Sequence, residues 1–115
     1  MKLIIVTLFA FTFIAQTTHA LPFNTIDDCE AVADLANAAM ELRQFGELTV
    51  IEAINLLRES YKELPDEYAA QITEVAFDMI TEAYEYPAMP TMDARQNAVI
   101  QFENRWTLRC LRAIR

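Results

Sequence analysis

The residues that could do chemistry in this chain are mainly carboxylates. Glu59 with Glu63, and Asp78 with Glu82, are spaced so that each pair could face one another across one turn of a helix. Paired carboxylates are the catalytic groups of glycoside hydrolases, which makes a carboxylate-only hydrolase one alternative. Such pairs occur on every acidic helix, and no cleft-forming residues accompany them here. We therefore expect that the protein is not an enzyme.

Most other catalytic groups are scarce. The only histidine is His19, the only serine is Ser60 and the only glycine is Gly46. Without a histidine beyond the first 20 residues, no imidazole can act as a base, activate a nucleophile or bind zinc or a di-iron centre. A single glycine excludes a phosphate-binding loop, a dinucleotide fingerprint and an EF-hand loop. We predict no catalytic residue, no metal site and no cofactor.

The first 20 residues have the layout of a secretory signal peptide. A basic residue precedes an apolar run over residues 3–15, and small residues, Thr18 and Ala20, stand at the positions that signal peptidase requires. The apolar run is shorter than the roughly 20 residues that span a bilayer. We therefore expect cleavage after Ala20, export to the periplasm or medium, and only transient membrane contact through the signal. Residues 21–115 then form a single domain, too small for two cores.

Export to an oxidising compartment would allow the two cysteines to form a disulfide. Cys29 and Cys110 lie near opposite ends of the predicted mature chain, in a compartment where disulfides persist. Two free thiols or an intermolecular bond are the alternatives. We expect an intramolecular bridge, because the helix order described below brings both cysteines to the same end of the domain.

Capping residues predict where the helices begin. Thr25 begins the first helix, and Thr91 the last. Thr49 and Glu52 form a capping box, which makes Thr49 the N-cap of the second helix. Pro65 either ends that helix or opens the third as its first residue, with helix three beginning near residue 66.

Glycine and proline predict where helices end. Gly46 is expected to stop the first helix in a left-handed conformation. The segment 86–90 holds two prolines and cannot continue the third helix. Within these limits apolar residues recur every three or four positions, as on one face of a helix. The expected inward residues are Cys29, Val32, Ala33, Ala36, Ala39, Met40, Val50, Ile54, Leu57, Tyr61, Leu64, Ala69, Ile72, Val75, Ala76, Met79, Ile80, Ala83, Val99, Phe102, Trp106, Cys110 and Ala113.

Four amphipathic helices with short connections predict an all-α fold, a small antiparallel four-helix bundle closed by one disulfide after the signal peptide. In an up-down-up-down order, the start of the first helix and the end of the fourth lie together. Cys29 and Cys110 become neighbours by topology alone.

The predicted mature domain is acidic, with 17 acidic side chains against eight basic ones once Lys2 is removed. Its last helix is basic, and Arg105, Arg109 and Arg112 form a stripe along it. The stripe could bind a partner. We favour pairing within the chain, with the acidic start of the first helix beside it. Nucleic acid is not an expected partner, because the protein is exported and acidic overall.

The third helix carries the opposite charge, in the stripe Glu67, Glu74, Asp78, Glu82 and Glu85. A divalent cation or a basic partner could account for it. We favour a solvated face that keeps the protein soluble.

The connection after the third helix is a second candidate interaction surface. Tyr84 and Tyr86 precede a proline-stiffened segment that contains Met89, and adaptable methionine beside rigid tyrosine suits recognition. The alternative, which we favour slightly, is a cap over the end of the bundle.

Short motifs along the chain resemble a loose group of short exported helical proteins of bacteriophages and bacteria with a terminal cysteine pair. The motifs are Cys29-Glu30, Ala39-Met40, Arg43-Gln44-x-Gly46, Ala83-Tyr84-Glu85-Tyr86-Pro87, Arg95, Ile100-x-Phe102-x-Asn104 and Cys110. The stretch 57–67 is longer here than in that pattern. The resemblance implies a source and a fold, and no mechanism.

Three non-enzymatic functions remain open at this point. The leading hypothesis is a non-catalytic interaction module that binds an unknown envelope or secreted protein. A second is a lysis or superinfection regulator whose signal segment is retained for a time in the membrane. A third is an acid-responsive holdase, suggested by the many carboxylates and the single bridge.

Overall fold

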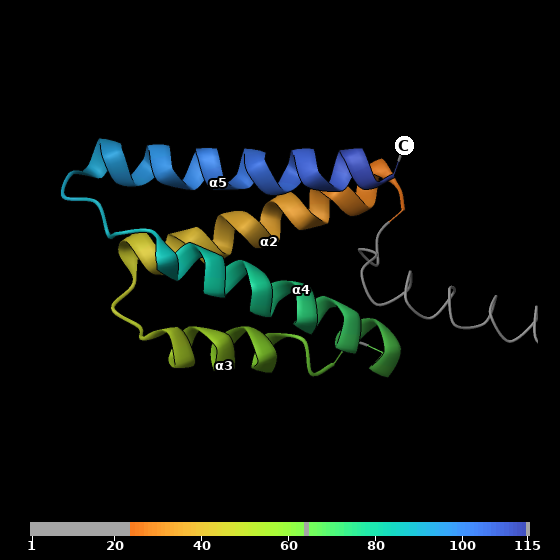
Figure 1. The fold of residues 1–115 in the computed structure, drawn as a ribbon. Coiled ribbons are helices and arrows are strands. Elements are labelled where there is room, and N and C mark those ends of the chain that lie inside the picture. The colour runs from red at the N-terminus through yellow and green to blue at the C-terminus, as the bar shows by residue number, and fades with distance from the viewer. Residues whose placement is uncertain (1–23, 64, 115) are drawn as a thin grey trace, which may run out of the picture.

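The computed structural model describes residues 24–63 and 65–114, and this part of the chain forms four helices and no strand. The helices are α2 (Ile26–Phe45), α3 (Val50–Ser60), α4 (Asp66–Glu85) and α5 (Met92–Ala113) (Figure 1). The predicted all-α fold is thereby confirmed. The predicted signal peptide, residues 1–20, and Leu64 lie outside the described residues. Within the described part, none of the helices has the length and apolarity needed to cross a bilayer.

Threonine side chains begin α2, α3 and α5, as the sequence predicts. The hydroxyl of Thr25 accepts a hydrogen bond from the backbone N–H of Asp28, and that of Thr49 accepts one from Glu52. Thr91 caps α5 in the same way. The predicted capping box of α3 is confirmed, and α2 has one as well, in which the Asp28 carboxylate accepts from the Thr25 N–H. These bonds satisfy N–H groups that the helix itself leaves unpaired.

The same hydrogen bonds favour the ionised form of the two capping carboxylates. The backbone N–H of Asn24 is the main cause that lowers the pKa of Asp28 below its ordinary value of 3.8, and the Thr25 hydroxyl adds to it. The backbone N–H of Thr49 lowers the pKa of Glu52 below its ordinary value of 4.5. Each carboxylate is therefore held charged at a helix N-terminus, where the dipole also favours an anion.

Gly46 ends α2, but in a different conformation from the one predicted. Its φ of −88° and ψ of 160° are extended, and not left-handed. Its N–H donates to the carbonyl of Leu42 at 3.1 Å, and a Cβ built at Gly46 would lie 2.7 Å from that same oxygen. Glycine is thus needed here because the backbone approaches itself closely, and not because φ is positive.

Prolines lie at both ends of α4. Pro65 is neither the end of α3, which stops at Ser60, nor the first residue of α4; it occupies the N-cap position before Asp66. At the other end, Tyr86 is extended with a ψ of 144°, as the proline that follows it requires. The prediction that the segment after α4 is non-helical is confirmed.

The α2–α5 contact is the most extensive in the fold. The two helices lie side by side and run in opposite directions (Figure 1). Ala36 and Ala39 are fully buried on α2, and such small side chains let neighbouring helices approach closely. Most of the predicted inward positions are confirmed, and the core consists of Cys29, Val32, Leu35, Ala36, Ala39, Met40, Ala53, Ile72, Val75, Ala76, Met79, Ile80, Ala83, Val99, Phe102, Trp106 and Cys110.

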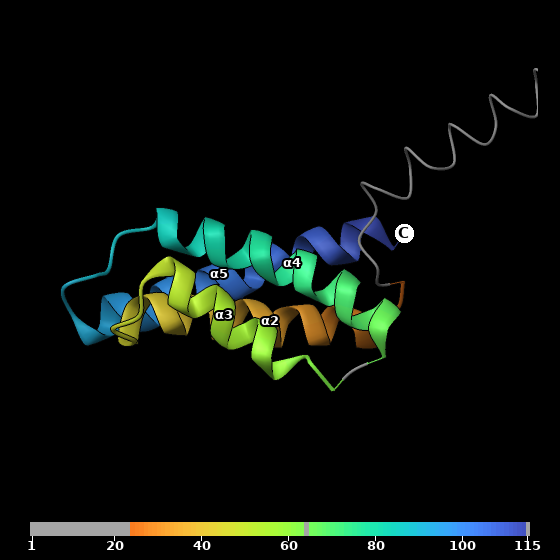
Figure 2. The ribbon, with the colours of Figure 1, turned by 90° about the horizontal axis from the view of Figure 1, so that it is seen from below.

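The other two helices are added to one side of this pair. α4 packs against α2, and α3 packs against α4, so that α3 lies on the opposite side of the molecule from α5 (Figures 1 and 2). Ala53 is the one residue of α3 that is buried, whereas Val50, Ile54 and Leu57 are partly covered. The predicted stripe of α3 therefore faces the core without being enclosed by it.

The predicted disulfide is present. Cys29 and Cys110 are bonded, with their Cα atoms 5.6 Å apart, and both are buried. The bridge joins the first turn of α2 to the last turn of α5. It closes a loop that contains α3, α4 and nearly all of α2 and α5.

Three alanines that the periodicity placed inside are less buried than predicted. Ala113 is exposed, and Ala33 and Ala69 are partly covered. The reason at Ala113 is geometric. The buried face of α5 ends at Cys110, opposite the start of α2, and within the described residues no further turn of helix lies beyond that point to cover Ala113.

Candidate functional site

The basic stripe of α5 is largely engaged within the molecule. Arg105 and Arg109 each place a guanidinium nitrogen 3.6 Å from the carboxylate of Glu82 on α4. Arg109 also stacks on the ring of Trp106, with its Cζ 4.1 Å from the ring centroid. Arg112 forms no ion pair with any described residue. Two of the three predicted interaction arginines thus share one acidic partner within the chain.

The acid that pairs with these arginines is not the one predicted. The sequence suggested the acidic first turn of α2, but the Asp28 carboxylate is held by the backbone N–H groups of Asn24 and Thr25. Glu82 takes its place because the side of α4 next to α5 presents it between the two arginines. Intramolecular pairing is therefore correct for Arg105 and Arg109, and its predicted partner is wrong.

The tyrosines that precede the proline segment are held by the body of the domain. The hydroxyl of Tyr84 donates to the carbonyl of Leu48 at 3.0 Å, and Arg43 lies over its ring at 5.1 Å. Burial raises the pKa of Tyr84, a nearby Arg43 charge opposes the shift, and Glu52 adds to it. Tyr86 packs edge-on against Phe102 with ring centroids 5.8 Å apart.

Met89 and the segment around it are fixed by a residue that the sequence analysis missed. Gln44 is only 3% exposed, accepts the backbone N–H of Met89 at 2.8 Å and donates to the carbonyl of Pro87 at 3.0 Å. Arg95 donates to the Met89 carbonyl at 2.7 Å, and Arg43 to that of Tyr86 at 2.8 Å. Three polar side chains thus hold the connection against the ends of α2 and α5.

A signal for Gln44 was present in the pattern. It follows Met40 by four residues and so continues the buried face of α2, where a polar residue must find partners. Its neighbours Arg43 and Gly46, the tyrosines and Arg95 belong to the motifs that carry the resemblance. The structure brings these separate motifs together at the end of the molecule opposite the disulfide. These contacts fix this end of the domain. We call the hydrogen bonds of Gln44, Arg43 and Arg95 to the backbone of residues 86–89 the Gln44 clamp.

An exposed apolar surface lies at the C-terminal end of α2 and on α3. Phe45 is exposed at the end of α2, and on α3 Ile51 is 63% and Leu56 48% exposed. A groove of about 410 Å³ runs between these helices and is lined by Ala38, Glu41, Leu42, Phe45, Gly46, Leu56, Leu57 and Ser60. We call this groove, with the exposed side chains of Phe45 and Leu56 that line it, the α2/α3 apolar surface. The sequence analysis assigned no role to Phe45 and Leu56, because periodicity does not show that α3 is left uncovered.

One acid of each carboxylate pair that the sequence singled out forms an ion pair within the chain. Glu59 is bound to Lys62 at 2.8 Å, and Glu82 is bound to two arginines. Among the described residues, no three His, Cys, Asp or Glu side chains gather in a way that could hold a metal ion. The remaining acids of the α4 stripe whose side chains are described, Glu74, Asp78 and Glu85, lie exposed.

No family model, curated protein or solved structure matches this chain.

Proposed function

We propose that this chain is an exported, non-catalytic protein-interaction module. In this proposal residues 1–20 are removed as a signal peptide, and the mature domain is a small antiparallel four-helix bundle closed by the Cys29–Cys110 bridge. The bridge supports export, since disulfides persist mainly in oxidising compartments. The partner is an envelope or secreted protein.

The observation that carries the proposal is the α2/α3 apolar surface. Large apolar side chains that gather on one exposed face, rather than singly, mark interaction sites on small proteins. Phe45 and Leu56 line the groove, and their neighbours Leu42 and Leu57 are partly covered. The basic stripe and the tyrosines support it less well, because their contacts are already made inside the domain.

Capture from an envelope extract, with the purified mature domain as bait, tests the proposal. Leu56→Ser removes an exposed apolar side chain from the surface, and Ile100→Ser is the matched control, because Ile100 is similarly exposed on α5. We expect one captured protein that is lost with Leu56→Ser and retained with Ile100→Ser. Equal capture by both variants, or none by the wild type, would contradict the proposal.

Export is tested separately by mass spectrometry of the secreted or periplasmic product. We expect the chain to begin at residue 21. A product that keeps residues 1–20 and stays with the membrane would favour the regulator with a retained anchor instead.

A further inference from the structure

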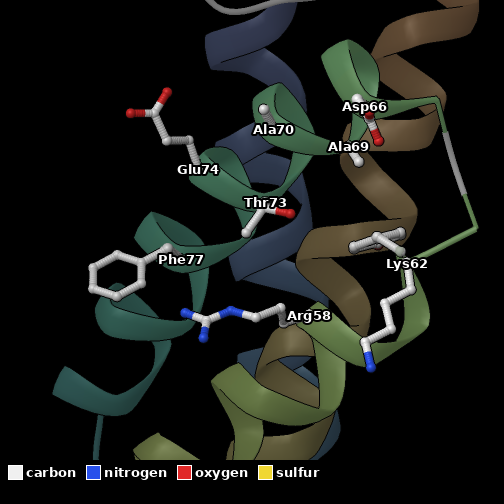
Figure 3. A pocket seen from close by; sticks show the side chains of 9 residues that line it. Arg58, Lys62, Asp66, Ala69, Ala70, Thr73, Glu74 and Phe77 are labelled. Carbon is white, nitrogen blue, oxygen red and sulfur yellow. The ribbon is translucent and has the colours of Figure 1, made fainter.

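A second groove lies on the other side of α3, between its C-terminal half and the N-terminal half of α4. Figure 3 shows the side chains that line it. Its volume is about 430 Å³, within the range of small-molecule sites. It shares no lining residue with the α2/α3 apolar surface.

The floor of this groove is apolar and open because its residues on α4 are small. Ala69 and Ala70 occupy the positions where larger side chains would fill the space, and Thr73 follows one turn later. Phe77 closes one end, and its ring is 48% exposed, which is unfavourable in water unless something covers it. An apolar chain laid along this floor would bury that ring.

Asp66 and Glu74 also line the groove, but neither forms an ion pair with Arg58, and Arg58 has no ion-pair partner among the side chains that the structure describes. By contrast, Lys62 is bound to Glu59 and Arg43 to the Tyr86 carbonyl. In Figure 3 the guanidinium of Arg58 extends from α3 towards Phe77, and the Glu74 carboxylate points away from it. The C-terminal end of α3 favours a cation at this position but supplies no carboxylate to it.

We propose that this groove binds a single-chain aliphatic carboxylate. The alkyl chain lies on Ala69, Ala70 and Phe77, and the carboxylate pairs with the Arg58 guanidinium, which is suited to that group. The occupant is a small amphiphile rather than a peptide helix. A helix needs several large apolar anchors spaced along it, and the aromatic lining of this groove is limited to Tyr61 and Phe77. The site is independent of the partner surface proposed above.

Titration of the bridged mature protein with decanoate, below its micelle concentration, tests the site by amide chemical shifts and calorimetry. We expect shifts confined to residues 58–62 and 69–77. Affinity should rise by up to about fourfold for each added methylene from octanoate to dodecanoate. Decanol and decyltrimethylammonium should bind more weakly, because neither can pair with Arg58.

Matched variants separate this site from non-specific binding. Arg58→Gln should weaken decanoate binding about two- to fivefold and remove its salt dependence. Arg112→Gln, which also removes an exposed arginine, should not change it. Phe77→Ser should weaken binding, with Ile100→Ser as its control, and Leu56→Ser should leave binding intact.

Several outcomes would overturn the proposal. Equal affinity of Arg58→Gln and wild type, shifts centred on the α2/α3 apolar surface, or equal binding of decanoate and its cationic analogue would each do so. Binding of an apolar peptide with a free C-terminus, in place of decanoate, would also overturn it. None of these results bears on capture of the protein partner, so the two proposals fail separately.

Discussion

α2 and α3 begin with the same kind of capping box but differ in how much of each helix is buried. Both start with a threonine and a reciprocal carboxylate three residues later. α2 then runs for 20 residues with seven of them buried, against α5 on one side and α4 on another, whereas α3 runs for 11 residues with only Ala53 buried. Capping decides where a helix starts, and packing decides how firmly it is held.

The difference has an energetic consequence. A helix of 11 residues is marginal by itself in water, so α3 depends on its contact with α4. α2 and α5 are joined by a disulfide at one end and by the Gln44 clamp at the other. We therefore expect α3 to open at lower free energy than the α2–α5 pair, and the predictions below measure that gap.

The largest effect should come from the bridge. It closes a loop with a sequence separation of 81 residues, so Cys110→Ser should lower the free energy of unfolding by about 2–5 kcal/mol. Chemical denaturation of the two proteins, with the reduced wild type as control, measures it. The reduced wild type should match the variant. A loss below about 1 kcal/mol would show that the α2–α5 contact holds without the bridge.

The second effect concerns the other end of the same pair. Gln44→Ala leaves the Pro87 carbonyl and the Met89 N–H without their partners and should cost about 1–3 kcal/mol. Gln96→Ala is the control, because Gln96 lies exposed on α5. Thermal or denaturant unfolding gives both values. Equal stability of the two variants would mean that water replaces the amide at no cost.

Sequence reasoning succeeds here where the determinant is local. The caps at Thr25, Thr49 and Thr91, the break at 86–90 and most of the inward stripe follow from residues close together in the chain. The disulfide followed from connectivity, since two cysteines at the ends of an even number of helices meet.

One failure is local, and the others are tertiary. Gly46 is required by an approach to the Leu42 carbonyl, which sequence does not reveal. The pairing of Arg105 and Arg109 with Glu82 depends on the rotation of α4 about its axis. That α3 lies uncovered, with grooves on both sides, depends on which helices pack on which, and periodicity is the same for a covered and an uncovered helix.

The third prediction compares caps on the two kinds of helix. Thr49→Ala and Thr91→Ala each remove one capping bond, worth about 1 kcal/mol. We expect Thr91→Ala to lower global stability by that amount, and Thr49→Ala to act mainly on hydrogen exchange of the α3 amides. Equal global losses in both variants would show that α3 unfolds together with the α2–α5 pair. α3 would then not open at a lower free energy than that pair.

The fourth effect is smaller, because the arginines are about half exposed. Arg105→Gln and Arg109→Gln should each cost about 0.2–1 kcal/mol, and Arg112→Gln should cost less. A double-mutant cycle with Glu82→Gln isolates the pairing. If the arginine losses persist in the Glu82→Gln background, stacking on Trp106 and Tyr86 supports these side chains instead of charge.

The smallest effect, and the sharpest comparison, is the response of the two capping boxes to acid. The pKa values of Asp28 and Glu52 are lowered in the folded chain, chiefly by backbone N–H groups of Asn24 and Thr49. A lowered folded pKa means that the stabilisation is fully present above the ordinary values of 3.8 and 4.5, and is lost as pH falls through the folded values. Carboxyl NMR titration should place both midpoints below those values, and Thr49→Ala should move only that of Glu52 upwards.

Protonation of the two carboxylates should also affect hydrogen exchange differently in α2 and in α3. The first turn of α2 contains Cys29 and is held by the bridge, so its amides should remain protected, whereas exchange at the first turn of α3 should accelerate. Equal acceleration at both helices would show that the bridge does not hold the start of α2.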